Sequence, residues 1–169
     1  KTELYLFSAL AVATLGTLVP FFLYNVFGNP QKHRKIFMGD TGALTIGLLL
    51  GVMSIRICQI EIIPGNYNVA VIAFAPLLIP CLDVVRVYLH RIKAHRNPFL
   101  PDKTHIHHKL LALGMKQRVA MLTIIGASAL LTLTNYFLSA YIGITTLFVS
   151  NLILWIVVNT ILTHSIHIR

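Results

Sequence analysis

Five long apolar runs constrain the fold of this chain more than any other feature of its sequence. They cover roughly residues 4–26, 41–60, 67–89, 119–140 and 143–164. A helix needs about 20 apolar residues to cross the ~30 Å hydrocarbon core of a bilayer. Of the 169 residues, 56% are hydrophobic and 11% are charged, which leaves little for a soluble core. The sequence predicts an all-α polytopic membrane protein, a single domain over residues 1–169 with about five transmembrane helices.

The positive charges predict how these helices are oriented. Lysines and arginines gather in the loop at 27–42 and in the polar segment at 90–118. If the first run points inward, both of these segments lie on the inner side of the membrane. The opposite connections, near 64–66 and 139–143, contain no lysine or arginine. By the positive-inside rule, both polar loops are cytoplasmic. Topology and contact with anionic membrane lipid explain most of the net charge of +9, so no nucleic-acid partner is expected.

Asp40 is an acidic residue at a junction between a loop and a predicted helix, next to Gly39 and Gly42. Glycines let the backbone approach a ligand closely, and a helix start offers unpaired N–H groups that suit anions. A carboxylate there could hold Mg²⁺ between the protein and a phosphate. The alternative is that Asp40 only caps the helix. The spacing leaves both interpretations open.

The long polar segment contains three histidines within four residues: His105, His107 and His108. Zinc normally takes four ligands, or three and a water, in a tetrahedral array, and neighbouring residues rarely converge in this way. Histidines that donate hydrogen bonds to phosphate or sugar oxygens fit better beside so many cations. The other interpretation is a solvated basic loop, which the prolines at 98 and 101 disfavour by stiffening it.

Polar residues inside the apolar runs are a further signal. Asp83 and Arg86 lie three residues apart and share a helix face. An ionisable residue in a membrane span suggests function, but the two could equally form a self-satisfied ion pair, and their role stays open. Asn135, Asn151 and Asn159 are expected to hydrogen-bond between helices.

Three motifs together resemble a known family. They are F-M-G-D-T-G at 37–42, P-x-x-D-x-x-R at 80–86 and N-P-F-x-P-D-x-x-H-I-H-H at 97–108. They look like those of the polyprenyl-phosphate N-acetylhexosamine-1-phosphate transferases, or glycosyl transferase family 4, and the H-I-H-H form resembles the N-acetylglucosamine branch. The resemblance implies transfer of a sugar 1-phosphate, N-acetylglucosamine 1-phosphate, from a UDP-sugar to undecaprenyl phosphate. UMP is released, and Mg²⁺, or alternatively Mn²⁺, is required.

The resemblance also implies a place and particular residues for this reaction. It would be the first membrane step of a cell-envelope polysaccharide such as the O-antigen of lipopolysaccharide, on the cytoplasmic face of the bacterial inner membrane. Asp40 would be the metal ligand and, with His105, a catalytic residue. The substrate-binding residues would be His105, His107, His108, Arg96, Lys103 and Gly39.

The sequence also departs from the family. Two further acidic motifs that the family carries upstream are absent, and five spans are about half of the usual number. We therefore expect the chain to be the C-terminal fragment of a larger transferase, inactive alone. One alternative is a non-catalytic membrane module that binds UDP-sugar or lipid phosphate. A transporter is disfavoured by the few midplane charges and the lack of a repeat. The G-x-x-x-G pair at 47–51 permits close helix packing, including in a homodimer.

Overall fold

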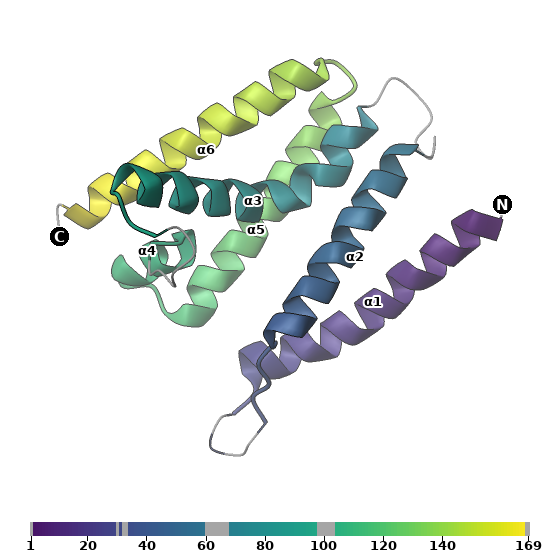
Figure 1. Ribbon diagram of the computed structural model, residues 1–169, viewed down its shortest axis with the longest axis horizontal. Coiled ribbons are helices and arrows are strands. Elements are labelled where there is room, and N and C mark those ends of the chain that lie inside the picture. The colour runs from purple at the N-terminus through teal and green to yellow at the C-terminus, as the bar shows by residue number, and fades with distance from the viewer. Residues whose placement is uncertain (1, 30, 32–33, 60–67, 98–103, 168–169) are drawn as a thin grey trace. The chain divides into compact units, whose positions relative to one another are not determined.

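The computed structural model describes residues 2–29, 31, 34–59, 68–97 and 104–167. Over this part the chain forms helices and no strand (Figure 1). The helices are α1 Thr2–Phe27, α2 Asp40–Gln59, α3 Val69–Lys93, α4 Ile106–Ala112, α5 Gln117–Leu138 and α6 Ile144–His167. All except α4 are long and apolar enough to cross a membrane. The prediction of an all-α polytopic membrane protein with five spans is confirmed.

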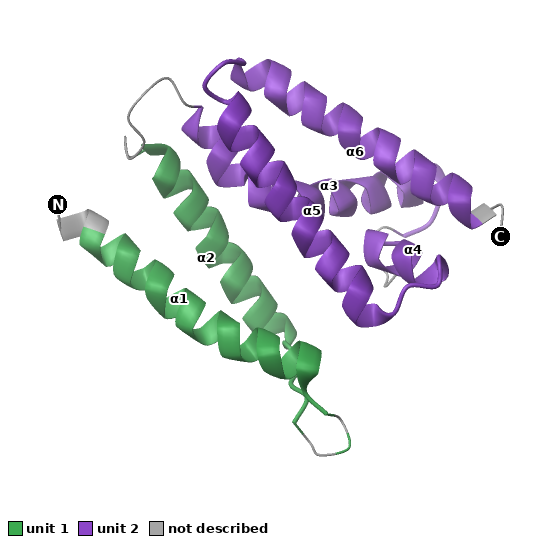
Figure 2. Cartoon of the chain, turned by 180° about the vertical axis from the view of Figure 1, so that it is seen from behind, with its two compact units in different colours: residues 1–59 green, residues 60–169 purple. Residues whose placement is uncertain are grey.

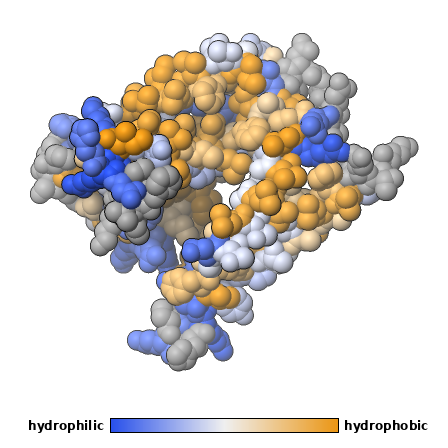
Figure 3. All heavy atoms as spheres, viewed as in Figure 1, coloured by the Kyte–Doolittle hydropathy of each residue, from blue (hydrophilic) through white to orange (hydrophobic). Residues whose placement is uncertain are grey.

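Large apolar side chains cover the outer surfaces of these helices. Leu44 is 75% exposed and Leu130 is 67% exposed. In Figure 3, apolar residues cover much of the helix surface in view, while hydrophilic residues gather near α4 and at the connection from α1 to α2. Soluble monomers rarely expose apolar patches of more than a few hundred Å². Such a surface is suited to lipid.

The chain divides into two units, residues 1–59 and residues 60–169, which are coloured separately in Figure 2. Each is described by itself, and the expectation of a single domain stays a prediction. In the first unit, the connection from α1 to α2 folds back on α1. Asn25 Nδ2 donates to the Ile36 carbonyl at 2.8 Å. A Cβ atom at Gly28 would overlap two backbone oxygens, so glycine is needed for this turn that leads to α2.

In the second unit, α3 packs on α5 and α6, and the short α4 also packs on α5 and α6. Small and polar side chains lie at these contacts, and Ala75 is fully buried. Asn151 Nδ2 donates to Asn135 Oδ1 at 2.8 Å, and Asn135 Nδ2 donates back to Asn151 Oδ1 at 3.3 Å. This reciprocal pair satisfies two buried amides and confirms the predicted hydrogen bonding between helices.

Two prolines interrupt the hydrogen bonding of α3. Pro80 has no N–H, so the carbonyl of Pro76, four residues earlier, lacks its helical donor. Ser128 Oγ of α5 donates to this carbonyl at 3.1 Å. A side chain from a neighbouring helix therefore replaces the missing backbone bond, as a carbonyl in lipid requires.

We expect Ser128→Ala to lower the free energy of unfolding by about 1 kcal/mol, because it leaves the Pro76 carbonyl without a donor in an apolar environment. Thermal unfolding of the detergent-solubilised protein measures this. Ser128→Thr keeps a hydroxyl and should retain most of the stability. Equal unfolding of the alanine variant and the unsubstituted protein would rule out this contribution.

Candidate active site

Asp83 of α3 is a buried acid, 5% exposed, on which several donors converge. Its Oδ2 lies 2.9 Å from His105 Nδ1. The Ile106 backbone N–H donates to the same oxygen at 3.1 Å. Arg86 Nη2 donates to Oδ1 at 2.8 Å. The ion pair within α3 therefore exists, but the carboxylate also binds residues that follow it by more than twenty positions.

These contacts determine which nitrogen of His105 carries a hydrogen. Since Arg86 and the Ile106 backbone can only donate, Asp83 acts as an ionised acceptor, and His105 Nδ1 must donate to it. The other ring nitrogen, Nε2, is then the one that can meet a ligand. A carboxylate that holds Nδ1 in this way orients the imidazole, as in Ser-His-Asp enzymes.

The same carboxylate helps to start α4. The N-cap residue, His105, makes no capping hydrogen bond with its side chain, and Asp83 accepts from the first helical N–H, that of Ile106, instead. Arg86 Nη2 also donates to the Thr104 carbonyl. Two side chains of α3 thus hold segment 104–106 in place, and with it the start of the histidine motif.

The three predicted histidines lie close together. The ring centroids of His105 and His107 are 6.0 Å apart with nearly parallel planes, and those of His107 and His108 are 4.0 Å apart. Partial burial, and then the neighbouring His108 and His105, lower the pKa of His107 below its ordinary value, although Asp83 opposes this. His107 is therefore neutral at pH 7 and can donate through only one ring nitrogen. We call His105, His107 and His108 the histidine cluster.

The lowered pKa of His107 predicts a dependence of stability on pH. Between the folded pKa and the ordinary value of about 6.5, the unfolded chain binds more protons, so the free energy of unfolding falls as the pH drops below about 6.5. We expect His107→Asn to lose less stability between pH 7.5 and pH 5 than the unsubstituted protein. Thermal unfolding across this range measures it. His164→Asn, outside the cluster, controls for loss of a histidine, and identical pH curves for all three proteins would contradict the assignment.

Arg96, a predicted substrate-binding residue, follows the end of α3. Its N–H donates to the Arg91 carbonyl at 2.9 Å, and His95, with φ of 53°, donates to Ile92 at 3.0 Å. This pattern is a Schellman motif, in which the left-handed position is usually glycine. Arg96 is exposed, and among the described residues no hydrogen bond joins it to the histidine cluster. Lys103 lies outside the described residues.

Asp40 and Gly39 belong to the first unit, where Asp40 is the first residue of α2. The Gly39 carbonyl accepts from the Ala43 N–H at 3.0 Å, so Gly39 occupies the capping position. The exposed carboxylate of Asp40 makes no hydrogen bond or ion pair with another described residue. The capping interpretation thus has no side-chain bond to support it, and the carboxylate is accessible to a ligand.

Comparison with known proteins gives one family. The model described as glycosyl transferase family 4 matches residues 2–58. The decaprenyl-phosphate N-acetylglucosaminephosphotransferase of Mycolicibacterium smegmatis is 34% identical over 127 residues, covering 69% of this chain and 30% of that protein. The undecaprenyl-phosphate alpha-N-acetylglucosaminyl 1-phosphate transferase of Yersinia pestis is 32% identical over 121 residues, covering 72% of this chain and 32% of that protein. The chain belongs to glycosyl transferase family 4.

The equivalent transferase of Escherichia coli K12 is 31% identical over 119 residues, covering 70% of this chain and 31% of that protein. The chain thus spans about a third of the length of the curated relatives it matches. Coverage of 69–72% of the chain extends beyond the segment 2–58 that the family 4 model matches. The similarity therefore reaches into the unit that contains the histidine cluster. No solved structure matches the chain significantly.

Sequence reasoning missed one further contact in this family 4 chain. Lys109 Nζ donates to Asn159 Oδ1 at 3.2 Å and to Thr163 Oγ1 at 2.8 Å, which joins α4 to α6. Burial, and then the nearby Arg86, lower the pKa of Lys109, although Asp83 opposes this. In the sequence, Lys109 is one of the cations beside the histidines, which indicates no contact with α6. The sequence feature that could have indicated a structural role for Lys109 is its position directly after the histidine motif.

Proposed function

We propose that this family 4 chain is part of a Mg²⁺-dependent transferase. It would move N-acetylglucosamine 1-phosphate from a UDP-sugar to undecaprenyl phosphate, release UMP, and work on the cytoplasmic face of a bacterial inner membrane. The relatives named above act on polyprenyl phosphates by name, which supports the acceptor class. The single observation that carries the proposal is the 2.9 Å contact between Asp83 and His105, because it orients His105 Nε2 toward a ligand.

The reaction joins two anions. A phosphate oxygen of the lipid attacks the β-phosphorus of the UDP-sugar, the bond from that phosphorus to the bridging oxygen breaks, and UMP leaves with the bridging oxygen. Positioning and neutralisation of charge supply most of the rate in such a reaction. In our proposal His105 Nε2 donates, in the charged form, to a pyrophosphate oxygen. His107 and His108 add hydrogen bonds to phosphate or sugar.

Asp40 suits the proposed magnesium. Its carboxylate is exposed and has no described partner, and the space beside Gly39 is open, since a Cβ there would meet no atom within 4 Å. Mg²⁺ in phosphate sites is commonly held by one or two carboxylates together with substrate phosphates. When bound, the ion neutralises charge on the pyrophosphate. Asp40 would hold it from the first turn of α2, and Mn²⁺ could replace it.

A second candidate function is a non-catalytic module that binds UDP-sugar or lipid phosphate. The aligned segment makes up only 30–32% of the relatives, so the activity of those whole proteins is not assumed for the 169 residues alone. We propose that the 169 residues alone bind the UDP-sugar without turning it over, and that the complete transferase supplies the missing acidic groups. Release of UMP by the purified chain alone would overturn this part.

The role of the histidine cluster is tested in the full-length transferase that carries this sequence. We expect His105→Ala to lower kcat/KM for UDP-N-acetylglucosamine by about tenfold or more, because a charge-assisted hydrogen bond is lost. The kinetics with lipid phosphate should change less. His164→Ala is the matched control. Unchanged UDP-sugar kinetics in His105→Ala, or stoichiometric zinc by elemental analysis, would contradict the proposed role.

A further inference from the structure

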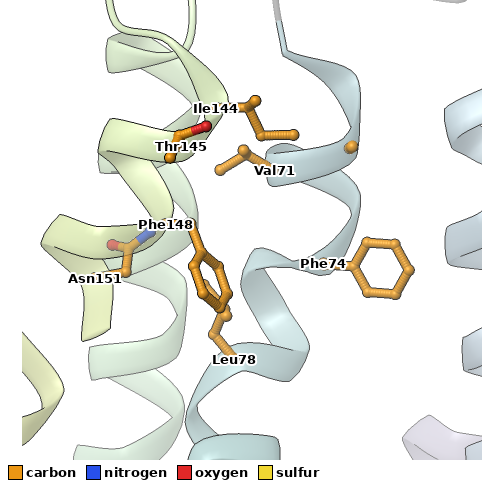
Figure 4. Close-up of a pocket in the computed structure, with 8 residues that line it drawn as sticks. Val71, Phe74, Leu78, Ile144, Thr145, Phe148 and Asn151 are labelled. Carbon is orange, nitrogen blue, oxygen red and sulfur yellow. The ribbon is translucent and has the colours of Figure 1, made fainter.

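Three cavities in the second unit differ in their chemistry. One of about 430 Å³ lies between the first turns of α3 and α6, where Phe148 and Leu78 point toward each other in Figure 4, and no charged residue lines it. Another, of about 450 Å³, lies between α3, α5 and α6 and is also uncharged. The third, of about 500 Å³, lies between α3 and α6 beside α4 and is lined by Arg86, His90 and Lys109 but by no acid. We call this third cavity the α3–α6 groove.

We propose that the α3–α6 groove binds the phosphate group of an anionic glycerophospholipid from the surrounding bilayer, at a site separate from the histidine cluster. Basic pockets between transmembrane helices are known to take such headgroups. The groove combines cations at the α4 end with apolar walls from Leu89, Leu152 and Ile156. This combination matches an anionic amphiphile rather than a free anion.

The polar end of the groove has the donors that a phosphate needs. Lys109 Nζ is held by two neutral oxygens, those of Asn159 and Thr163, and no described acid pairs with it. Asn159 is only 6% exposed, so Lys109 is held against a buried wall. A partly buried cation without an anion carries an unfavourable desolvation energy. A phosphate beside Lys109 and Arg86 would offset it through charge-assisted hydrogen bonds.

Trp155, which also lines the groove, supplies an independent observation. Trp155 is 8% exposed, and its Nε1 is a buried donor that has no hydrogen-bond partner among the described residues. A buried N–H that is left without an acceptor is unfavourable, and a small shift of the indole toward the groove would let an ester or phosphate oxygen of a lipid accept from it. Trp155 and Leu82 line both the α3–α6 groove and the uncharged cavity between α3, α5 and α6. The acyl chain of a lipid in the groove would therefore lie next to the uncharged cavity between α3, α5 and α6.

The choice of a bilayer phospholipid over the reacting lipid rests on the proposed function. A reacting phosphate must come within about 3–3.5 Å of the donor phosphorus. We placed the donor at the histidine cluster, and none of its three residues lines the groove. A lipid in the groove would instead affect the reaction through Arg86, which lines the groove and also holds Asp83 and the Thr104 carbonyl.

The test measures lipid retention without turnover. The purified 169-residue chain is placed in nanodiscs of phosphatidylcholine with increasing phosphatidylglycerol, and the bound lipid is counted by native mass spectrometry. We expect one phosphatidylglycerol to be retained, and Lys109→Gln to weaken its retention about tenfold or more. Lys93→Gln removes the same charge from the exposed end of α3, outside the groove, and should leave retention unchanged.

Two further variants exclude an effect of misfolding. Lys109→Arg keeps the charge and should retain the lipid. Trp155→Phe keeps an aromatic ring, although a smaller one, but removes the N–H donor and should weaken retention several-fold. Equal retention by Lys109→Gln would overturn the proposal. Displacement of phosphatidylglycerol by an equimolar short-chain polyprenyl phosphate would also overturn it, because the groove would then belong to the acceptor. The lipid-retention test measures no turnover. A negative result would therefore not affect the transferase proposal, and an inactive transferase would not affect the proposal of lipid binding in the α3–α6 groove.

Discussion

Asp83→Asn is expected to lower kcat/KM for the UDP-sugar by about 10- to 100-fold in the full-length transferase. The amide has nearly the size of the carboxylate but not its charge, so it cannot hold both Arg86 Nη2 and His105 Nδ1 as the carboxylate does. His105 then loses its orientation and the carboxylate that accepts from its Nδ1. Steady-state kinetics with UDP-N-acetylglucosamine measure the loss, and the melting temperature shows whether the protein remains folded.

A double-mutant cycle separates positioning of His105 from a general structural role. If Asp83 acts through His105, Asp83→Asn combined with His105→Ala should be no more impaired than His105→Ala alone. Asp83→Glu, which keeps the charge but moves it, should recover part of the activity. Independent effects that multiply in the double variant would show that Asp83 supports the fold and not the histidine.

Asp40→Asn is expected to reduce turnover by about 10²–10³-fold or more, because the carboxylate that would hold the proposed metal is lost. The loss should persist at every Mg²⁺ concentration, while expression and melting temperature stay unchanged, since the carboxylate has no described partner. Thr41→Ser, at the next position of α2, is the matched control. Near-normal turnover of Asp40→Asn across a Mg²⁺ titration would remove Asp40 from metal binding.

The spans could be predicted because their length follows directly from bilayer thickness. The exact ends of the helices could not be predicted in this way. α3 continues to Lys93, four residues beyond the predicted end at 89, since basic residues such as Arg91 are favourable in the last turn of a helix. The seven-residue α4 was not predicted. It is too short for a periodic pattern, and its first N–H is capped by a residue of another helix.

The candidate site, too, could be predicted only in part. Proximity of the three histidines follows from their spacing in sequence, and the pairing of Asp83 with Arg86 follows from helix geometry. The contact of Asp83 with His105 could not be predicted, because it joins distant residues and depends on how segment 104–106 lies against α3. The contacts of Lys109 with α6 join residues fifty or more positions apart and require the packing of α4 against α6. Local patterns carry no information about such contacts.

The central claim is that sugar and phosphate move together to a lipid. It is tested most directly with UDP-N-acetylglucosamine that carries a radioactive label in its β-phosphate, incubated with the full-length transferase, Mg²⁺ and undecaprenyl phosphate. We predict that the label enters the lipid fraction in a one-to-one ratio with released UMP, and that His105→Ala reduces both equally. Label that remains in water-soluble UDP while the sugar reaches the lipid, or no transfer at all, would contradict the proposed reaction.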